Sequence, residues 1–226
     1  MTAILKQVTL FCLFFFSTNI LAAQENIGIL VFDGVLTSDI TAPVEVFGAA
    51  SKKTWFSNYK VILIAATEKT QIVTEEGLVI VADTTIHEDI SLSVLIAPSA
   101  YNMKPLLKDK QLISFIRNQG SKVKWVASNC SGSFLLSEAG LLDGKNATTW
   151  AGGESELQRK YPNLKVKHNT NVVVDKGVIT SNGSVVSYQA ALTLLAKLSS
   201  ASLAQEVADS IQWQRLKTAK YSFLTQ

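Results

Sequence analysis

The sequence predicts an α/β domain built on a mostly parallel sheet with helices on both faces. Short apolar runs rich in β-branched residues, such as NIGILVF at 26–32, are typical of strands buried on both sides. Segments with helical signals alternate with these runs along the chain. This alternation is the pattern of parallel strands joined by crossover helices.

The expected core strands are short, mainly apolar runs, found at 26–32, 59–66, 92–98 and 122–128. Segment 71–84 alternates around Glu76-Gly77, which predicts a short hairpin. Segment 164–181 predicts further strands with a turn at 175–177.

Each expected helix has a start or a stop signal. Thr41 is a candidate cap for a helix that begins near Pro43, because proline suits a first helical turn. Segment 104–120 has apolar residues on one face and ends at Gly120, which predicts one helix with a glycine stop. The remaining expected helices cover 132–140, 154–161, 185–200 and 202–214.

The N-terminus predicts a secretory signal peptide over residues 1–23. Lys6 is followed by the apolar run VTLFCLFFF, and LAA before Gln24 offers small residues for cleavage. The alternative is an uncleaved membrane anchor, but Ser17, Thr18 and Asn19 interrupt the apolar stretch before it reaches about 20 residues. We therefore expect a single domain over 24–226, periplasmic or secreted, with no stable membrane association after cleavage.

Composition excludes several classes of partner. The chain has 21 basic and 18 acidic residues, a formal net charge of +3, and no long basic run, so nucleic acid is not an expected partner. Its 2 histidines and 2 cysteines give no metal-ligand spacing, and no phosphate-loop motif occurs. We expect a small-molecule substrate or ligand, with no metal and no other cofactor.

Cys130 is the strongest functional candidate from the residues alone. Signal cleavage removes Cys12 and leaves one unpaired thiol in an exported protein, where cysteines are usually paired. Cys130 falls between the strand 122–128 and the helix 132–140. A nucleophile on such a turn projects above the sheet, and the helix N-terminus favours a thiolate. The alternative is a buried cysteine that packs as a small apolar residue.

The topology also predicts which loops accompany that cysteine. Ligands of parallel sheets bind beyond the carboxyl ends of the strands. The loops 33–39, 99–102 and 129–131 follow three of the expected strands and should meet at that edge.

Two stretches resemble a known family. ASNCSGSFLLSEAGLLDGKNATTW (127–150) and GILVFDGVLTSDITAPVEVF (28–47) are similar to the DJ-1/PfpI superfamily, which is class I glutamine amidotransferase-like. The nearest branch holds isonitrile hydratases and the ligand-binding halves of AraC-type regulators. The resemblance implies a flavodoxin-like three-layer sandwich with a cysteine on a strand-to-helix turn, and a homodimer.

The resemblance also implies roles for three residues. Cys130 matches the reactive cysteine, Asp39 the acid that contacts its sulfur, and Ser131 stands where isonitrile hydratases have threonine. The implied reaction is attack of the thiolate on the terminal carbon of an isonitrile, protonation by the acid and addition of water. An ionised carboxylate beside a thiol raises its pKa, whereas a protonated carboxyl stabilises the thiolate, so the two groups titrate together.

The sequence departs from the family pattern in several places. Ser131 replaces the histidine of related proteases, which argues against a Cys-His protease, and His87 and His168 are expected on the surface. Ser99 and Ala100 replace a Gly-Gly pair whose amides form an anion pocket in the family.

Aromatic residues are the other departure. Trp150 stands where the hydratase branch has histidine, and Tyr188 begins the penultimate helix. Tyr101, Trp150 and Tyr188 are candidates for an aromatic pocket wall, with ordinary core packing as the alternative.

Two functions remain open from the sequence. One is an exported, cysteine-dependent hydratase or hydrolase of the isonitrile-hydratase type. The other is a non-catalytic ligand-binding or redox-sensing domain that uses the same cysteine pocket. A transcription regulator is not expected, since no helix-turn-helix segment follows the domain.

Overall fold

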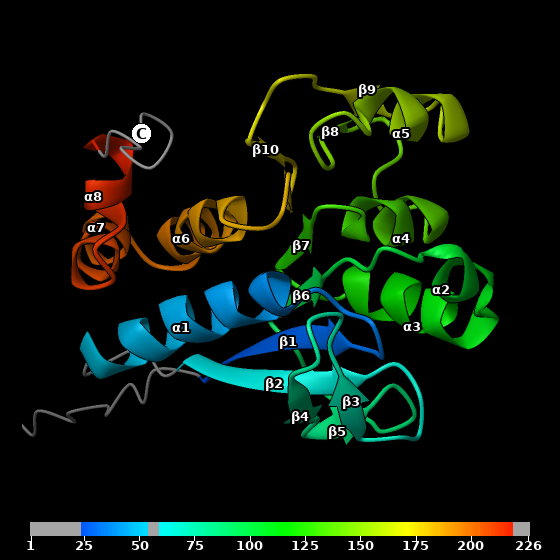
Figure 1. Ribbon diagram of the computed structural model, residues 1–226, viewed down its shortest axis with the longest axis horizontal. Coiled ribbons are helices and arrows are strands. Elements are labelled where there is room, and N and C mark those ends of the chain that lie inside the picture. Colours follow the sequence, from blue (N-terminus) through cyan, green and yellow to red (C-terminus); the bar gives the residue numbers. More distant parts are fainter. Residues whose placement is uncertain (1–23, 54–58, 219–226) are drawn as a thin grey trace, which may run out of the picture.

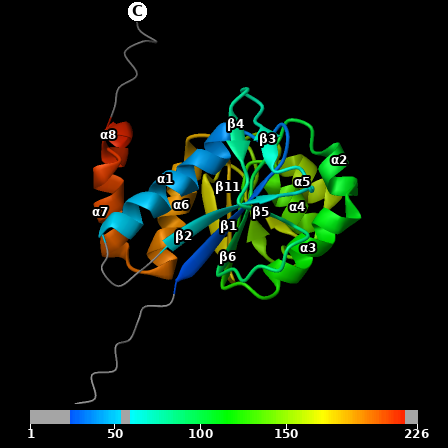
Figure 2. The same cartoon turned by 90° about the horizontal axis from the view of Figure 1, so that it is seen from below.

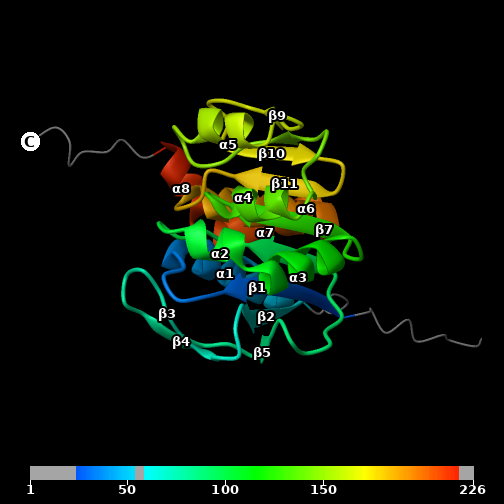
Figure 3. The ribbon, with the colours of Figure 1, turned by 90° about the vertical axis from the view of Figure 1, so that its right-hand side faces the viewer.

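A seven-stranded sheet forms the middle layer of the computed structural model, which describes residues 24–53 and 59–218. Its strand order is β10-β11-β7-β6-β1-β2-β5, and each pairing is parallel except that of β10 with β11 (Figure 3). The strands are β1 (Glu25–Val31), β2 (Tyr59–Ala65), β5 (Thr84–Thr85), β6 (Val94–Ala97), β7 (Trp125–Asn129), β10 (Val172–Asp175) and β11 (Val178–Ser181). The predicted mostly parallel sheet is confirmed.

Helices cover both faces of this sheet (Figures 1 and 2). One outer layer contains α1 (Thr37–Lys53), α6 (Val186–Leu198), α7 (Ala201–Ser210) and α8 (Trp213–Thr218). The other contains α2 (Lys104–Lys108), α3 (Lys110–Gly120), α4 (Gly132–Glu138) and α5 (Glu154–Lys160). Side chains alternate along the central strands, so that Ile29 packs in the first interface with Phe47 and Leu30 packs in the second with Leu135. The three-layer α/β sandwich is therefore confirmed.

Two small sheets flank the main one. β3 (Gln71–Val73) and β4 (Val79–Val81) form the predicted hairpin, and Gly77 in its turn has a φ of +86°. β8 (Asn146–Ala147) pairs with β9 (Lys165–Val166). No segment of the described chain qualifies as a helix long and apolar enough to cross a bilayer. The predicted signal peptide, residues 1–23, lies outside the described residues.

The helix predicted to begin near Pro43 begins at Thr37 instead, so Pro43 lies inside α1. A proline inside a helix has no N–H to donate to the carbonyl four residues earlier, here that of Asp39. Asn129 supplies the missing donor, since its Nδ2 lies 3.2 Å from that carbonyl oxygen. A tertiary hydrogen bond thus replaces a helical one.

The single helix predicted over 104–120 is divided into α2 and α3 at Asp109. Asp109 has extended backbone angles, φ −76° and ψ 103°, which interrupt the helix. Its carboxylate accepts hydrogen bonds from the amides of Gln111 and Leu112 and so caps α3.

Candidate active site

Three loops meet at the carboxyl edge of the sheet, as the topology predicts. The amide of Leu36 donates to the carbonyl of Ser99 at 2.9 Å. The hydroxyl of Ser131 donates to the carbonyl of Ala100 at 3.1 Å. These bonds join the loop after β1, the loop after β6 and the turn after β7 into one rim.

Cys130 lies on the turn between β7 and α4 with a φ of +50°. This left-handed backbone is strained for a residue with a side chain. The turn is held on both sides, because the Cys130 amide donates to the carbonyl of Ser181 and its carbonyl accepts from Thr149 Oγ1, each at 2.9 Å. We call this turn, Cys130 and its neighbours Asn129 and Ser131, the cysteine elbow.

Glycines allow the chain to pack closely around the elbow. A Cβ atom on Gly132 would lie 2.0 Å from the carbonyl oxygen of Ala97. A Cβ atom on Gly183 would lie 2.4 Å from the Cβ of Cys130. The end of β6 and the loop after β11 therefore both contact the elbow at distances that exclude a side chain.

Asp39 is completely buried, with 0% of its surface exposed. Its Oδ2 accepts hydrogen bonds from the amide of Ser99 at 3.1 Å and from the Ser99 hydroxyl at 2.5 Å. Its Oδ1 accepts from the amide of Ser184 at 3.2 Å and from the Ser187 hydroxyl at 2.8 Å. Burial raises the pKa of Asp39 above its ordinary value, although all four hydrogen bonds act in the opposite direction.

Cys130 is a half-buried free thiol. Burial raises its pKa most, and the charge of Asp39 raises it further. Hydrogen bonds from the Ser99 hydroxyl and from the amide and hydroxyl of Ser131 lower the pKa but do not offset this effect. The resting group is therefore a thiol at neutral pH, and it can act as a nucleophile once its proton has an acceptor.

The amides of Ser99 and Ala100 do not form the open anion pocket that the resemblance implies. The Ser99 amide donates to Asp39, and the Ala100 amide points at the sulfur of Met103 at 3.3 Å. Both amides already donate hydrogen bonds within the chain. The Ser99 hydroxyl, which donates to Asp39, and the Ala100 carbonyl, which accepts from Ser131, are the other atoms through which these residues contact the site.

The three candidate aromatic residues do not form a common wall. Tyr101 is 79% exposed. Trp150 stacks on Phe134 with ring centroids 5.3 Å apart. Tyr188 stacks on Trp213 at 6.3 Å. Trp150 and Tyr188 therefore pack against other aromatic side chains, which is the alternative to a pocket wall that the sequence left open.

Two residues that hold Asp39 were missed by sequence reasoning. Ser184 lies in the loop between β11 and α6, and Ser187 lies in the first turn of α6. β11 pairs with β7 in the sheet, so the carboxyl end of β11 lies beside the elbow. The signal available in the sequence was the polar segment SNGS (181–184), which follows a buried strand.

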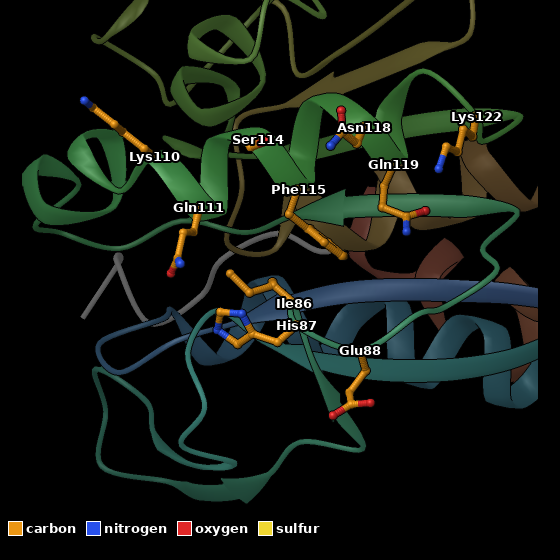
Figure 4. Close-up of a pocket in the computed structure, with 10 residues that line it drawn as sticks. All are labelled: Ile86, His87, Glu88, Lys110, Gln111, Ser114, Phe115, Asn118, Gln119 and Lys122. Carbon is orange, nitrogen blue, oxygen red and sulfur yellow. The ribbon is translucent and has the colours of Figure 1, made fainter.

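A hollow lies elsewhere, between the loop after β5 and helix α3 (Figure 4). It has a volume of about 450 Å³ and is lined by Ile86, His87, Glu88, Lys110, Gln111, Ser114, Phe115, Asn118, Gln119 and Lys122. No residue of the cysteine elbow lines this α3 hollow, and neither does Asp39. His87 and His168 are exposed, as predicted. In the part of the chain that the structure describes, no three His, Cys, Asp or Glu side chains are grouped to hold a metal ion.

Comparisons with known proteins agree on the fold and the family pattern. The sequence model described as the DJ-1/PfpI family matches residues 25–197. Isonitrile hydratase from Pseudomonas putida is 33% identical over 183 residues, 80% of this chain and 75% of that protein. The crystal structure of a ThiJ/PfpI family protein from Pseudomonas syringae has a TM-score of 0.75 at 25% identity and covers 85% of this chain and 76% of that one. Drosophila melanogaster DJ-1beta has a TM-score of 0.74 over 84% of this chain and 98% of its own, and at 19% identity it supports the fold alone.

Proposed function

The chain belongs to the DJ-1/PfpI family, and from that premise we propose that it is a cysteine-dependent hydratase of the isonitrile-hydratase type. We propose that it acts on a small molecule after export, since residues 1–23 have the pattern of a signal peptide. One observation carries the proposal. A free cysteine lies on a strand-to-helix turn at a φ of +50°, and the charge of the fully buried Asp39 acts on its thiol.

The first half of the reaction forms a bond between the enzyme and the substrate. The Cys130 thiol gives up its proton, and the thiolate attacks the terminal carbon of the isonitrile R–NC. The new C–S bond leaves an electron pair on that carbon. Asp39, which has taken up the thiol proton, protonates the carbon and gives the thioimidate R–N=CH–S. The raised pKa of Asp39 suits a group that must hold this proton at neutral pH.

The second half releases the product. Water adds to the thioimidate, its oxygen to the carbon and one hydrogen to the nitrogen. The C–S bond then breaks, the hydroxyl proton returns to the sulfur, and R–NH–CHO leaves. The balance is R–NC plus water giving an N-substituted formamide, with no redox change and no cofactor.

A second function, ligand binding without turnover, is favoured by one observation. The amides of Ser99 and Ala100 are both hydrogen-bonded within the chain. They therefore offer no ready donors to the oxygen that develops on carbon in the second half of the reaction.

The test is turnover of small alkyl and aryl isonitriles by the purified protein, with the formamide measured by NMR. We expect formamide from the wild type and a loss of roughly 10³-fold or more in Cys130→Ala, because the nucleophile is removed. His87→Ala, which changes the α3 hollow, is the matched control and should keep full activity.

Two results would count against hydration. Absence of turnover in the wild type across isonitriles, aldehydes and esters would overturn it. Saturable binding of isonitriles without turnover would favour the ligand-binding alternative.

A further inference from the structure

Two exposed apolar side chains lie on the loops that flank the cysteine elbow. Tyr101, in the loop after β6, is 79% exposed, and Val185, in the loop after β11, is 65% exposed. In the sheet β7 lies between β11 and β6, so these loops are on opposite sides of the turn that carries Cys130. Strands two places apart in a sheet are separated by about 10 Å. The two side chains therefore come from the two sides of the proposed nucleophile.

The position of Tyr101 is fixed through its neighbour. The carbonyl of Ala100 accepts a hydrogen bond from the Ser131 hydroxyl at 3.1 Å, and Ser131 is the residue directly after Cys130. Ala100 also forms an isolated antiparallel bridge with Val35. Tyr101 is therefore attached one residue from the point where its loop contacts the elbow, while its own side chain is exposed.

The position of Val185 is fixed in the same way on the other side. The amide of the preceding residue, Ser184, lies 3.2 Å from Asp39 Oδ1. Gly183 is so near the elbow that a Cβ atom on it would lie 2.4 Å from the Cβ of Cys130. Val185 therefore stands where the chain leaves these contacts, and its side chain is exposed.

The two loops are uncharged. Segments 99–102 and 182–185 contain no Asp, Glu, Lys or Arg. Asp39, on the inner side of the site, is completely buried, so a molecule bonded to the sulfur has to extend outward past the loops. An apolar group placed there is removed from water by contact with Tyr101 and Val185.

We propose that Tyr101 and Val185 form the subsite for the R group of the substrate, and that it selects neutral molecules with a flat apolar R group, such as aryl isonitriles. The choice of isonitriles rests on the proposed function. The subsite itself binds an aryl group on any neutral molecule that reaches Cys130. Tyr101 supplies a ring on which the aryl group stacks, and Val185 supplies methyl groups on the opposite side.

Two alkylating reagents with the same reactive carbon test the subsite without a substrate. Iodoacetamide has no R group, and N-phenyliodoacetamide adds a phenyl ring. Each forms the same C–S bond with Cys130 and releases iodide. The measurement is the ratio of the two rates in the folded protein, followed by mass spectrometry of the peptide that contains Cys130 and divided by the same ratio for glutathione. Both reagents need the same thiolate, so a change in the pKa of the thiol cancels in this ratio.

The wild type should react preferentially with the phenyl reagent. Tyr101→Ala should lower the ratio by about two- to tenfold, because the stacking partner is removed, whereas Tyr101→Phe keeps the ring and should keep the ratio. Val185→Ala should lower the ratio by about threefold. Both side chains are exposed, so these variants should fold like the wild type.

Val81→Ala is the matched control, since Val81 is 68% exposed but lies in the β3–β4 hairpin. It should leave the ratio unchanged. No preference for the phenyl reagent in the wild type, or an unchanged ratio in Tyr101→Ala, would overturn the subsite. A changed molecular mass of Tyr101→Ala in light scattering, with an unchanged ratio, would assign this side chain to contact between copies of the chain instead.

The reagent ratio is independent of turnover, so it decides the subsite even if the wild type hydrates no isonitrile and the proposed function fails. If isonitriles are hydrated, Tyr101→Ala should lower kcat/KM for phenyl isonitrile by about two- to tenfold, with little change for methyl isonitrile. An equal loss for both isonitriles would overturn the subsite and leave the proposed function standing.

Discussion

The cysteine elbow and the α3 hollow differ in what surrounds them. The hollow is a space of about 450 Å³, with exposed polar side chains such as His87 and Glu88 on its walls. At the elbow, backbone segments pack so closely that two glycines have no room for a Cβ atom. The elbow nevertheless holds the proposed nucleophile, Cys130, and the fully buried Asp39 lies beside it.

If the proposed function holds, this difference teaches that reactivity in this protein depends on fixed surroundings and not on the size of an opening. A carboxyl group in water has its ordinary acidity and mobile neighbours. Asp39 has no contact with water and four fixed donors, so its proton affinity is set by the chain.

The comparison is tested most strongly by neutralising one acid in each region. Asp39→Asn should lower isonitrile turnover by about 10²- to 10³-fold, because the variant cannot protonate the carbon. The same variant should speed alkylation of Cys130 at neutral pH, because the repelling charge is gone. Glu88→Gln in the α3 hollow should change neither quantity. Slower alkylation in Asp39→Asn would contradict this expectation, because it would mean that the carboxylate promotes ionisation of the thiol instead of opposing it.

Adding one methyl group in each region tests the packing difference. Gly132→Ala should reduce the free energy of unfolding by about 3 kcal/mol, because its Cβ meets the backbone oxygen of Ala97 at 2.0 Å and the backbone has no free rotation. Gly120→Ala, at the end of α3, meets a terminal carbon of the Leu141 side chain, which can rotate away. We expect a cost of about 1 kcal/mol or less there, measured by urea unfolding. Equal costs would mean that the elbow is not the more rigid region.

The smallest expected effect is on stability at alkaline pH. The pKa of Cys130 is raised above its ordinary value of 9.0, so between the unfolded and folded values the native state binds more protons than the unfolded state. Stability from this group is therefore full below the unfolded pKa and is lost as the pH rises, by at most about 1.4 kcal/mol per pH unit.

Cys130→Ala should consequently lose less stability than the wild type between pH 8 and pH 10, measured by urea unfolding. Ser114→Ala, on the wall of the α3 hollow, should follow the wild type. A Cys130→Ala curve parallel to the wild type would show that the thiol titrates alike in both states.

The predicted strands were found where burial produces a continuous apolar run, as over 27–31 in β1 and 61–65 in β2. Strands β5 and β8 have two residues each, which is too short for an alternation of apolar and polar residues to be recognised in the sequence. The start of α1 was placed too late, because Pro43 suits a first turn and only the contact with Asn129 makes it acceptable farther inside.

The candidate site was predictable in its cysteine and its acid but not in its hydrogen bonds. Cys130 and Asp39 stand out by motif and by their places after buried strands. Ser187 is 148 positions away from Asp39, and no local spacing joins them. For Ser99 the position was predicted but not the direction of its amide, because backbone torsions in a loop are set by the neighbouring strands.

Pro43 has one more consequence. Every turn of a regular helix has the same backbone hydrogen bonds. These bonds therefore do not determine the position of the helix along the sheet. On α1 the carbonyl of Asp39 has no helical donor and is therefore different from the others. Asn129, 90 positions later and next to Cys130, donates a hydrogen bond to it. A slip of one residue would rotate the helix by about 100° and present a carbonyl that is already occupied. The hydrogen bond from the Asn129 side chain thus fixes the position of α1 along the sheet and aligns the backbone segments that carry Asp39 and Cys130.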